Sequence, residues 1–231
     1  QAIGFAIDRQ AITDELFLNS QLSIPYYHHL GHEFLQPNPY ELDITYNPDH
    51  SRELIAETIA SGEWEADRSV DFVFQGQEVS DELLFLVQYM QDVGLNVNLR
   101  GLGDRAAFNT TVLNEMNYDL VSICNAFGPD PDSVTIYYKS GFSANDGGFN
   151  FTQFSNARVD EILESARTET DPAARIALYQ ELQGILDDEQ VMIPIRLLRV
   201  GWVIRANVNA TPQHYGHLPN YAGIETWTIT N

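Results

Sequence analysis

The stretch from residue 80 to residue 100, SDELLFLVQYMQDVGLNVNLR, indicates a helix followed by a strand, because its apolar residues change their spacing at a glycine. Up to that glycine the spacing is helical, at Leu83, Leu86, Val87 and Met90. Ser80 is placed to cap this helix and Gly94 to end it. From Leu95 to Leu99 apolar and polar residues alternate, which predicts a half-buried strand.

Two further strand patterns flank this helix and strand. Apolar residues alternate from Val70 to Phe74 before the helix. A second helix is expected from about Asp104 to Met116, and an alternating run from Tyr118 to Cys124 follows it. Three strands separated by two helices predict a parallel βαβαβ unit with right-handed crossovers. The fold class is therefore α/β.

The second half of the chain predicts a pair of antiparallel helices. The first carries its apolar face on Val159, Ile162, Leu163 and Ala166. Asp171 and Pro172 start the second, whose apolar residues are Leu178, Leu182, Ile185 and Leu186. The run from Val191 to Ile204 reads as extended chain, with Pro194 marking an edge or a bulge.

The charge balance excludes some classes of partner. Among 231 residues, 33 are acidic and 12 are basic, which gives a formal net charge of −21. Such a field repels nucleic acid and anionic lipid, so neither is expected as a partner. With 44% hydrophobic and 11% aromatic residues the chain can bury a core, so it is expected to fold.

Neither the ends of the chain nor its single cysteine identifies the cellular compartment of the protein. Cys124 is the only cysteine, so no disulfide forms within the chain. No apolar run reaches the roughly 18 residues that span a bilayer, and no signal pattern opens the chain. The chain starts inside an apolar helical pattern, QAIGFAIDRQAI, so we expect it to be a piece of a longer protein.

A glycine motif and a histidine cluster each allow a functional and a structural interpretation. GLGDRA, residues 101 to 106, matches a dinucleotide-binding turn, but the acid expected at the end of the next strand is instead Asp119 at its start. Turn glycines are the better interpretation. YYHHLGHE, residues 26 to 33, offers His28, His29 and His32 beside Glu33. Because Gly31 and nearby prolines favour a loop, a polar surface or cleft-lining loop is expected rather than a metal site.

The carboxylates leave one enzymatic alternative open. GPDPDS and SANDGGFN lack the spacing of a calcium loop, so capping and turn roles are expected. No G-x-S-x-G elbow is present, and Cys124 ends an apolar strand, where a structural thiol is the default. A hydrolase that uses a carboxylate pair stays an alternative, because such a pair needs only spatial proximity. An interaction module without a small ligand is a third class.

Five stretches resemble segments of one protein family. AIGFAIDRQAI is similar to R-x-A-hydrophobic-x-x-A-I-D-R, YNPDHSRELIAETIASG to Y-D-P-x-x-A-x-x-L-L-x-x-A-G, and QYMQDVGLNVNL to Q-x-L-x-x-hydrophobic-G-I-x-V. MNYDLVSICNAFGPDPDSV resembles Y-D-hydrophobic followed by G-W and D-x-x-D-P. FNFTQFSNARVDEILESARTETDPAARIALYQELQGILDDEQVMIPI resembles a segment that contains D-x-x-x-R-x-x-L-Y and ends in P-x-I-P-L. The family is solute-binding family 5, the extracellular solute-binding proteins of oligopeptide and dipeptide type ABC importers.

The resemblance implies a receptor rather than an enzyme. It implies a type II periplasmic-binding-protein-like lobe, with a central, mostly parallel sheet and flanking helices. Residues 1–204 would be the carboxy-terminal ligand-binding lobe, and residues 205–231 would return through the hinge toward a missing amino-terminal lobe. The implied partners are a peptide or other small solute and a membrane permease, with no cofactor. The full-length protein would be extracellular or periplasmic, anchored as a lipoprotein.

In this family the ligand lies between two lobes, against the carboxyl ends of the strands. The resemblance therefore implies a ligand-binding wall in this chain made of Gln75, Cys124, Asn125, Phe127 and Gly128. Two of these depart from the family, which usually has Trp at Cys124 and, in peptide-binding members, an Asp for the ligand amino group at Phe127. Asp132, after Asp130-Pro131, is expected to act as a helix N-cap rather than as a ligand group.

Overall fold

A computed structural model of the chain describes most of its residues. The described ranges are 1–17, 23–30, 44–124, 128, 130–142, 148–198, 204–210, 213–215, 218–220 and 224–229.

The central sheet is parallel, as predicted. Its strands are β2 (Ser69–Phe74), β3 (Asn96–Gly101) and β4 (Leu120–Ser122), in the order β3-β2-β4. Phe74 at the end of β2 lies opposite Gly101 on one side and Ser122 on the other, so the three carboxyl ends meet at one edge. We call this the carboxyl edge. It is where the loops that follow the strands begin.

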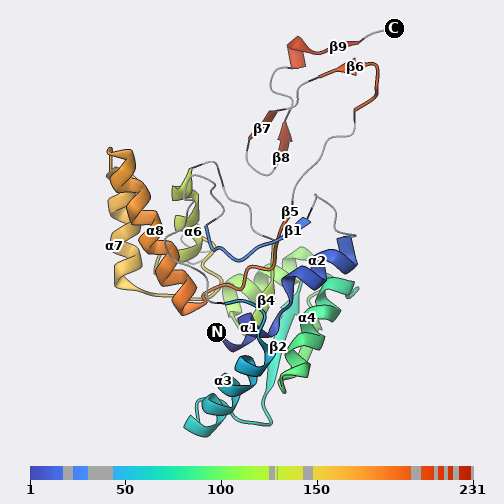
Figure 1. Cartoon of the computed structure of the whole chain (residues 1–231), viewed down its shortest axis with the longest axis vertical. Coiled ribbons are helices and arrows are strands. Elements are labelled where there is room, and N and C mark those ends of the chain that lie inside the picture. The colour runs from blue at the N-terminus through green and yellow to red at the C-terminus, as the bar shows by residue number, and fades with distance from the viewer. Residues whose placement is uncertain are drawn as a thin grey trace.

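Alternating residues of β2 pack against helices on opposite faces of the sheet (Figure 1). Phe72 and Phe74 contact one apolar cluster, which includes Ile12 of α2 (Arg9–Phe17) and the buried face of α4 (Asp81–Asp92). Val73 contacts a second cluster, with residues of α5 (Arg105–Asn109) and of the π-helix η2 (Thr110–Glu115). Burial on both faces explains why β2 is apolar at consecutive positions.

The helix caps account for where the helices begin and end. Ser80 accepts a hydrogen bond from the backbone N–H of Leu83, and Gly94 has a φ of +98°, so the predicted limits of α4 are confirmed. The helix expected from Asp104 to Met116 is present, but it continues from α5 into η2 and ends at Met116, whose φ is +50°. Helix α3 (Pro48–Ser61) packs on α1 (Ala2–Ala6).

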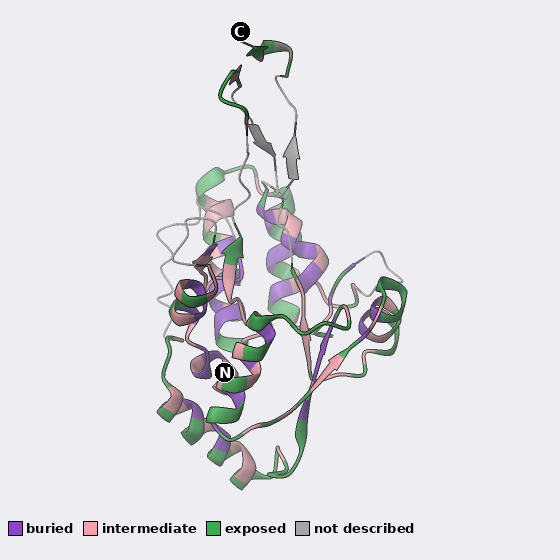
Figure 2. Cartoon of the chain, turned by 90° about the vertical axis from the view of Figure 1, so that its right-hand side faces the viewer, coloured by how far each residue is buried: buried purple, intermediate pink, exposed green. Residues whose placement is uncertain are grey.

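A second core lies under the predicted helix pair. Helices α7 (Ala157–Thr168) and α8 (Pro172–Glu189) pack on each other and on α6 (Thr135–Tyr138), which follows the 3-10 helix η3 (Pro131–Val134). Figure 2 shows buried residues on the inner faces of this pair. Val159, Ile162, Tyr179, Leu182 and Leu186 are fully buried there.

Three short antiparallel ribbons complete the described chain. Strand β1 (Ser23–Pro25) pairs antiparallel with β5 (Arg196–Leu198), so part of the run expected to be extended is a strand, which begins two residues after Pro194. Farther along, β6 (Val208–Asn209) pairs with β9 (Thr228–Ile229), which follows the 3-10 helix η5 (Ile224–Thr226). Strand β7 (Gln213–Tyr215) pairs with β8 (Leu218–Asn220), and these four strands stand apart from the helices in Figure 1.

Candidate functional site

Three of the five expected ligand-binding residues can be placed. Gln75 directly follows β2 and is exposed, and Cys124 is exposed two residues after β4, so both lie at the carboxyl edge. Gly128 is half-buried in the loop before η3. Asn125 and Phe127 lie outside the described residues. The expectation that Cys124 is a structural thiol is wrong, because its side chain is not in the core.

The glycines of residues 101 to 106 shape the carboxyl edge. A Cβ atom on Gly101 would lie 2.5 Å from the backbone oxygen of Gly76, and Gly103 has a φ of +59°. The backbone N–H of Gly103 donates a hydrogen bond to Gly76 O at 3.1 Å, which joins the loops after β2 and β3. Asp104 then caps α5. These roles support the interpretation as turn glycines.

The acid that a dinucleotide site would need lies at the other end of the sheet. Asp119 accepts a hydrogen bond from the backbone N–H of Asp71 at 2.8 Å and pairs with Arg68, which precedes β2. Its carboxylate therefore sits at the amino ends of the strands. A nucleotide at the carboxyl edge would be out of its reach, as expected from the sequence.

The loop from Gly128 to Ser133 is held by its own side chains. The backbone N–H of Gly128 donates to Oγ of Ser133 at 3.0 Å. Asp130, not Asp132, caps η3, since its Oδ1 accepts a hydrogen bond from the backbone N–H of Asp132. The assignment of Asp132 as the N-cap is therefore wrong. Pro131 supplies the first residue of η3, so the cap falls on the residue before it.

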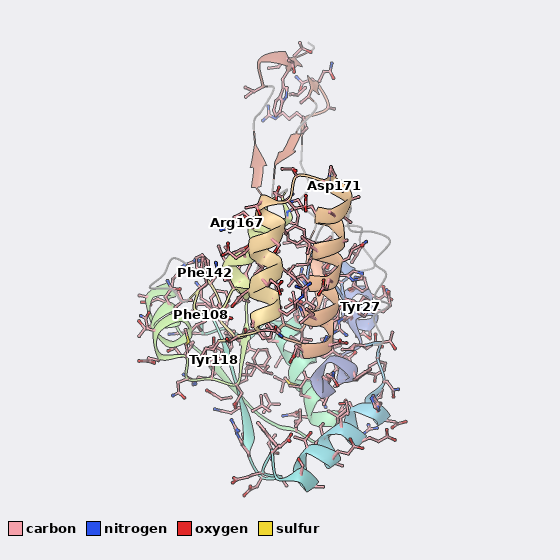
Figure 3. All side chains as sticks on the ribbon, turned by 90° about the vertical axis from the view of Figure 1, so that its left-hand side faces the viewer. Tyr27, Phe108, Tyr118, Phe142, Arg167 and Asp171 are labelled. Carbon is pink, nitrogen blue, oxygen red and sulfur yellow. The ribbon has the colours of Figure 1, made fainter. Side chains whose placement is uncertain are left out.

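The same two aspartates line a hollow with two arginines. It measures about 400 Å³ and is lined by Gly128, Asp130, Asp132, Ser133, Arg167 and Arg175. Arg175 of α8 donates two hydrogen bonds to Asp130, and Nε of Arg167 lies 3.3 Å from Oδ2 of Asp132. Figure 3 shows Arg167 and Asp171 at the same end of the α7–α8 pair. Because each arginine has a carboxylate partner, the hollow is balanced in charge.

One residue near the carboxyl edge was not found from the sequence. Arg196 of β5 donates to both carboxylate oxygens of Glu82, at 2.6 Å and 3.0 Å, and its guanidinium stacks on the ring of Phe17 at 4.5 Å. The hydrogen bond with Glu82 is the main reason that the pKa of Arg196 is raised, and Cys124 contributes electrostatically. Since 114 positions separate Arg196 from Glu82, no local pattern predicted this pairing.

The histidine segment is more deeply buried than expected. His28 is half-buried and His29 is only 1% exposed, so the description of this segment as a surface or cleft-lining loop is wrong for His29. His32 and Glu33 lie outside the described residues. Within the described ranges, no three His, Cys, Asp or Glu side chains are grouped as a metal site would require. Within the same ranges, no helix is long and apolar enough to cross a bilayer.

Comparison with known proteins identifies the family. Residues 1–148 match bacterial extracellular solute-binding proteins, family 5 Middle. The chain belongs to this family. Family 5 proteins are periplasmic or extracellular solute-binding proteins and not enzymes, so the hydrolase alternative is set aside. A search of curated proteins found no match.

Solved structures share the family 5 fold at low sequence identity. The chain superimposes on NikZ from Campylobacter jejuni, in complex with Ni(L-His), with a TM-score of 0.75 and 17% identity over 98% of this chain and 47% of that one. For the oligopeptide-binding protein AppA from Bacillus subtilis, in complex with a nonapeptide, the TM-score is 0.75 and the identity 13%, over 100% of this chain and 47% of that one. For DppA from Helicobacter pylori, in complex with the peptide STSA, the TM-score is 0.68 and the identity 16%, over 84% of this chain and 37% of that one. The chain thus spans less than half the length of these structures, which confirm its periplasmic-binding-protein-like fold.

Proposed function

We propose that residues 1–204 form the carboxy-terminal, ligand-binding lobe of the substrate-binding component of an ABC importer. Residues 205–231 would return through the hinge toward the amino-terminal lobe of the same protein. The family match and the share of the solved structures that this chain spans support this division. The short ribbons β6–β9 and β7–β8, which stand apart from the helices, are consistent with a segment that packs on another lobe (Figure 1).

The observation that carries the proposal is the exposure of Gln75 and Cys124 at the carboxyl edge. In open α/β sheets this edge is where ligands bind. Gly128 begins the loop that Ser133 and Asp130 hold rigid, so ordering it on binding would cost little. Together with Asn125 and Phe127, these residues would form one wall of a cleft between two lobes.

The ligand would be a peptide or another small solute, delivered to a membrane permease. Structural relatives hold peptides in two cases and a nickel–histidine complex in a third, so these two classes are the first probes. We further propose that the full-length protein is anchored as a lipoprotein on the outer side of the membrane that holds the permease.

The exposed thiol of Cys124 allows a direct test in the longer protein. A maleimide reagent would be added with and without a dipeptide, an oligopeptide mixture or Ni(II)-histidine, and labelling at Cys124 would be followed by peptide mass spectrometry. A solute that fills the cleft should slow labelling of Cys124, because the thiol would be covered. Equal rates with a solute that calorimetry shows to be bound would contradict the placement of the site.

Substitution of Gln75 tests the same wall by affinity. Gln75→Ala should weaken binding of the identified solute, by about 1 kcal/mol for a lost hydrogen bond. Gln88→Ala is the matched control, since Gln88 is an exposed glutamine on α4 and its side chain bonds only to Asp92 among the described residues. An equal effect of the two variants would argue against a ligand at the carboxyl edge.

A further inference from the structure

Polar side chains from three segments meet in the second core. His29 follows β1, Tyr138 belongs to α6, and Gln183 and Asp187 lie one turn apart on α8. All four are buried, with exposed fractions from 0% for Tyr138 to 8% for Asp187. A buried polar cluster is costly unless its members are paired with one another.

Hydrogen bonds dock the segment 26–30 on α8. The backbone N–H of Leu30 donates to Oε1 of Gln183 at 2.8 Å, and Nε2 of Gln183 donates to Oδ1 of Asp187 at 2.7 Å. The hydroxyl of Tyr138 donates to the backbone oxygen of His29 at 3.4 Å. The segment is therefore held by side chains of α6 and α8, and Asp187 is the last member of the chain of hydrogen bonds.

The ring of His29 and one oxygen of Asp187 complete this cluster. Nε2 of His29 lies 3.5 Å from Oδ1 of Asp187. Within the described part of the chain, neither ring nitrogen of His29 makes a hydrogen bond, and Oδ2 of Asp187 accepts none. Among the described residues, the imidazole and the carboxyl group are therefore the partners available to each other. A movement of a few tenths of an ångström would bring them into hydrogen-bonding range.

Other titratable groups face this pair from every packed element. They are Arg9 of α2, Tyr26 and His28 of the same segment, Tyr138 of α6 and Asp188 of α8. Arg9 and His28 disfavour a second positive charge on His29, and Asp188 disfavours a negative charge on Asp187. Tyr26 and Tyr138 stay neutral, because burial raises the pKa of both phenols.

Burial acts in opposite directions on the two partners. It raises the pKa of Asp187 to about 7 and lowers the pKa of His29 to about 3. Between these values the folded pair holds one proton in all, whichever of the two atoms carries it. Both the neutral pair and the ion pair contain that single proton, and both have no net charge.

From this geometry we propose that His29 and Asp187 form a one-proton latch, which holds the segment 26–30 on α8 and loosens when the pair loses that proton. The latch is a property of this lobe and does not depend on which solute the protein binds. Because residues 26–30 directly follow β1, the protonation state of the His29–Asp187 pair affects how firmly the chain after β1 is held on α8.

The sign of the pH dependence follows from proton counting. In the unfolded chain Asp titrates near 3.9 and His near 6.5, so between about pH 4 and pH 6.5 both states hold one proton and the pair adds no pH dependence. Above about pH 6.5 the unfolded pair loses its proton first. The contribution of the latch to stability therefore falls as the pH rises from there through the pKa of the folded pair.

Single substitutions at His29 and Asp187 should change the pH dependence of stability in opposite directions. In Asp187→Asn only His29 titrates, with its pKa depressed in the fold, so stability relative to wild type should rise as the pH rises from about 4 to 6.5. In His29→Gln only Asp187 titrates, with its pKa raised, so stability relative to wild type should fall as the pH rises from about 4 to 6.5. In each case the unfolding equilibrium constant should change by about tenfold per pH unit.

Urea unfolding of the full chain at several pH values measures these slopes. Glu189→Gln is the matched control, because Glu189 is an exposed carboxylate at the end of α8 that does not act on either partner of the pair, so its curve should run parallel to that of the wild type. Slopes of opposite sign in the two variants support the latch. A curve for Asp187→Asn that runs parallel to those of wild type and Glu189→Gln overturns it.

Hydrogen exchange of the wild-type chain tests the docking itself without any variant. The amide of Leu30 reports on it, because this N–H donates to Gln183. After correction for intrinsic exchange rates, its protection should be constant from about pH 4 to 6.5 and fall about threefold or more by about pH 9. Protection of Leu30 that stays constant through pH 9 overturns the proposal.

Discussion

Arg175 of α8 donates a hydrogen bond to each carboxylate oxygen of Asp130, at 2.6 Å and 3.1 Å, although the two residues are 45 positions apart in the sequence. The same Asp130 caps η3, and the same Arg175 donates to the backbone oxygen of Ala166 at the end of α7. One ion pair thus joins the loop that follows the carboxyl edge to the helix pair. The position of that loop depends on the second core, not only on the strand before it.

Loss of this carboxylate should destabilise the lobe more than loss of its neighbour. Asp130→Ala removes a cap and a bidentate partner of Arg175, so we expect a loss of about 2 kcal/mol. Asp132→Ala removes the bond from Thr135 and a 3.3 Å contact with Arg167, for which we expect less than about 1 kcal/mol. Urea unfolding measures both. A larger loss for Asp132→Ala would show that the cap contributes little.

Local patterns predicted the elements around the sheet because their causes are local. Ser80 and Gly94 lie within a few residues of the backbone groups that they satisfy, so the limits of α4 could be read from the sequence. The alternation in β2 predicted a strand in the same way, and its pairing with β3 followed from the helix between them. Gln75 and Cys124 could be placed at the carboxyl edge because Gln75 follows one predicted strand and Cys124 ends another.

Features that depend on distant contacts could not be predicted. Strand β1 pairs with β5 across more than 170 positions, and Arg196 meets Glu82 across 114. His29 reads as a loop residue, and only the packing of α6 and α8 around it explains its burial. The helical pattern after Asp104 also gave no sign of the π-helix, since α- and π-turns bury similar faces over so few residues.

Removal of a core leucine should be far more costly than removal of a surface leucine. Leu186 is fully buried in the second core, so Leu186→Ala should lose about 3 kcal/mol through lost apolar contact and a cavity. Leu84 on α4 is 53% exposed, and Leu84→Ala should change stability by less than about 0.5 kcal/mol. Thermal or urea unfolding gives both values. A small effect at Leu186 would mean that the core between α6, α7 and α8 is loosely packed.

Salt should stabilise this acidic lobe. A net charge of −21 repels itself, and ions screen that repulsion over about 10 Å at 0.1 M. We expect the melting temperature to rise from low to about 1 M sodium chloride. In the triple variant Glu57→Gln, Glu63→Gln and Glu65→Gln, at exposed positions, salt should raise the melting temperature by less, because the variant carries less negative charge. A melting temperature that falls with salt would show that ion pairs dominate instead.

A carboxylate at position 127 should change the solute preference of the longer protein. The family resemblance implies an Asp in peptide-binding members where this chain has Phe127, and a phenyl ring cannot form an ion pair with an ammonium group. We expect Phe127→Asp to weaken binding of the natural solute, measured by calorimetry, and Phe127→Leu to retain more of it. Unchanged affinity in Phe127→Asp would place residue 127 away from the ligand.

The last prediction concerns Arg196, which holds β5 against the start of α4. Its guanidinium donates to both oxygens of Glu82 and stacks on Phe17, a geometry that lysine cannot reproduce. Both side chains are largely covered, with exposed fractions of 21% and 25%, so Arg196→Lys should lose about 1 to 2 kcal/mol. Arg100→Lys is the control, because Arg100 also pairs with a carboxylate, Asp71, but is more exposed, so its loss should stay below about 1 kcal/mol. Urea unfolding distinguishes the two. Equal losses would mean that the stacking and burial of Arg196 add nothing to an ordinary surface ion pair.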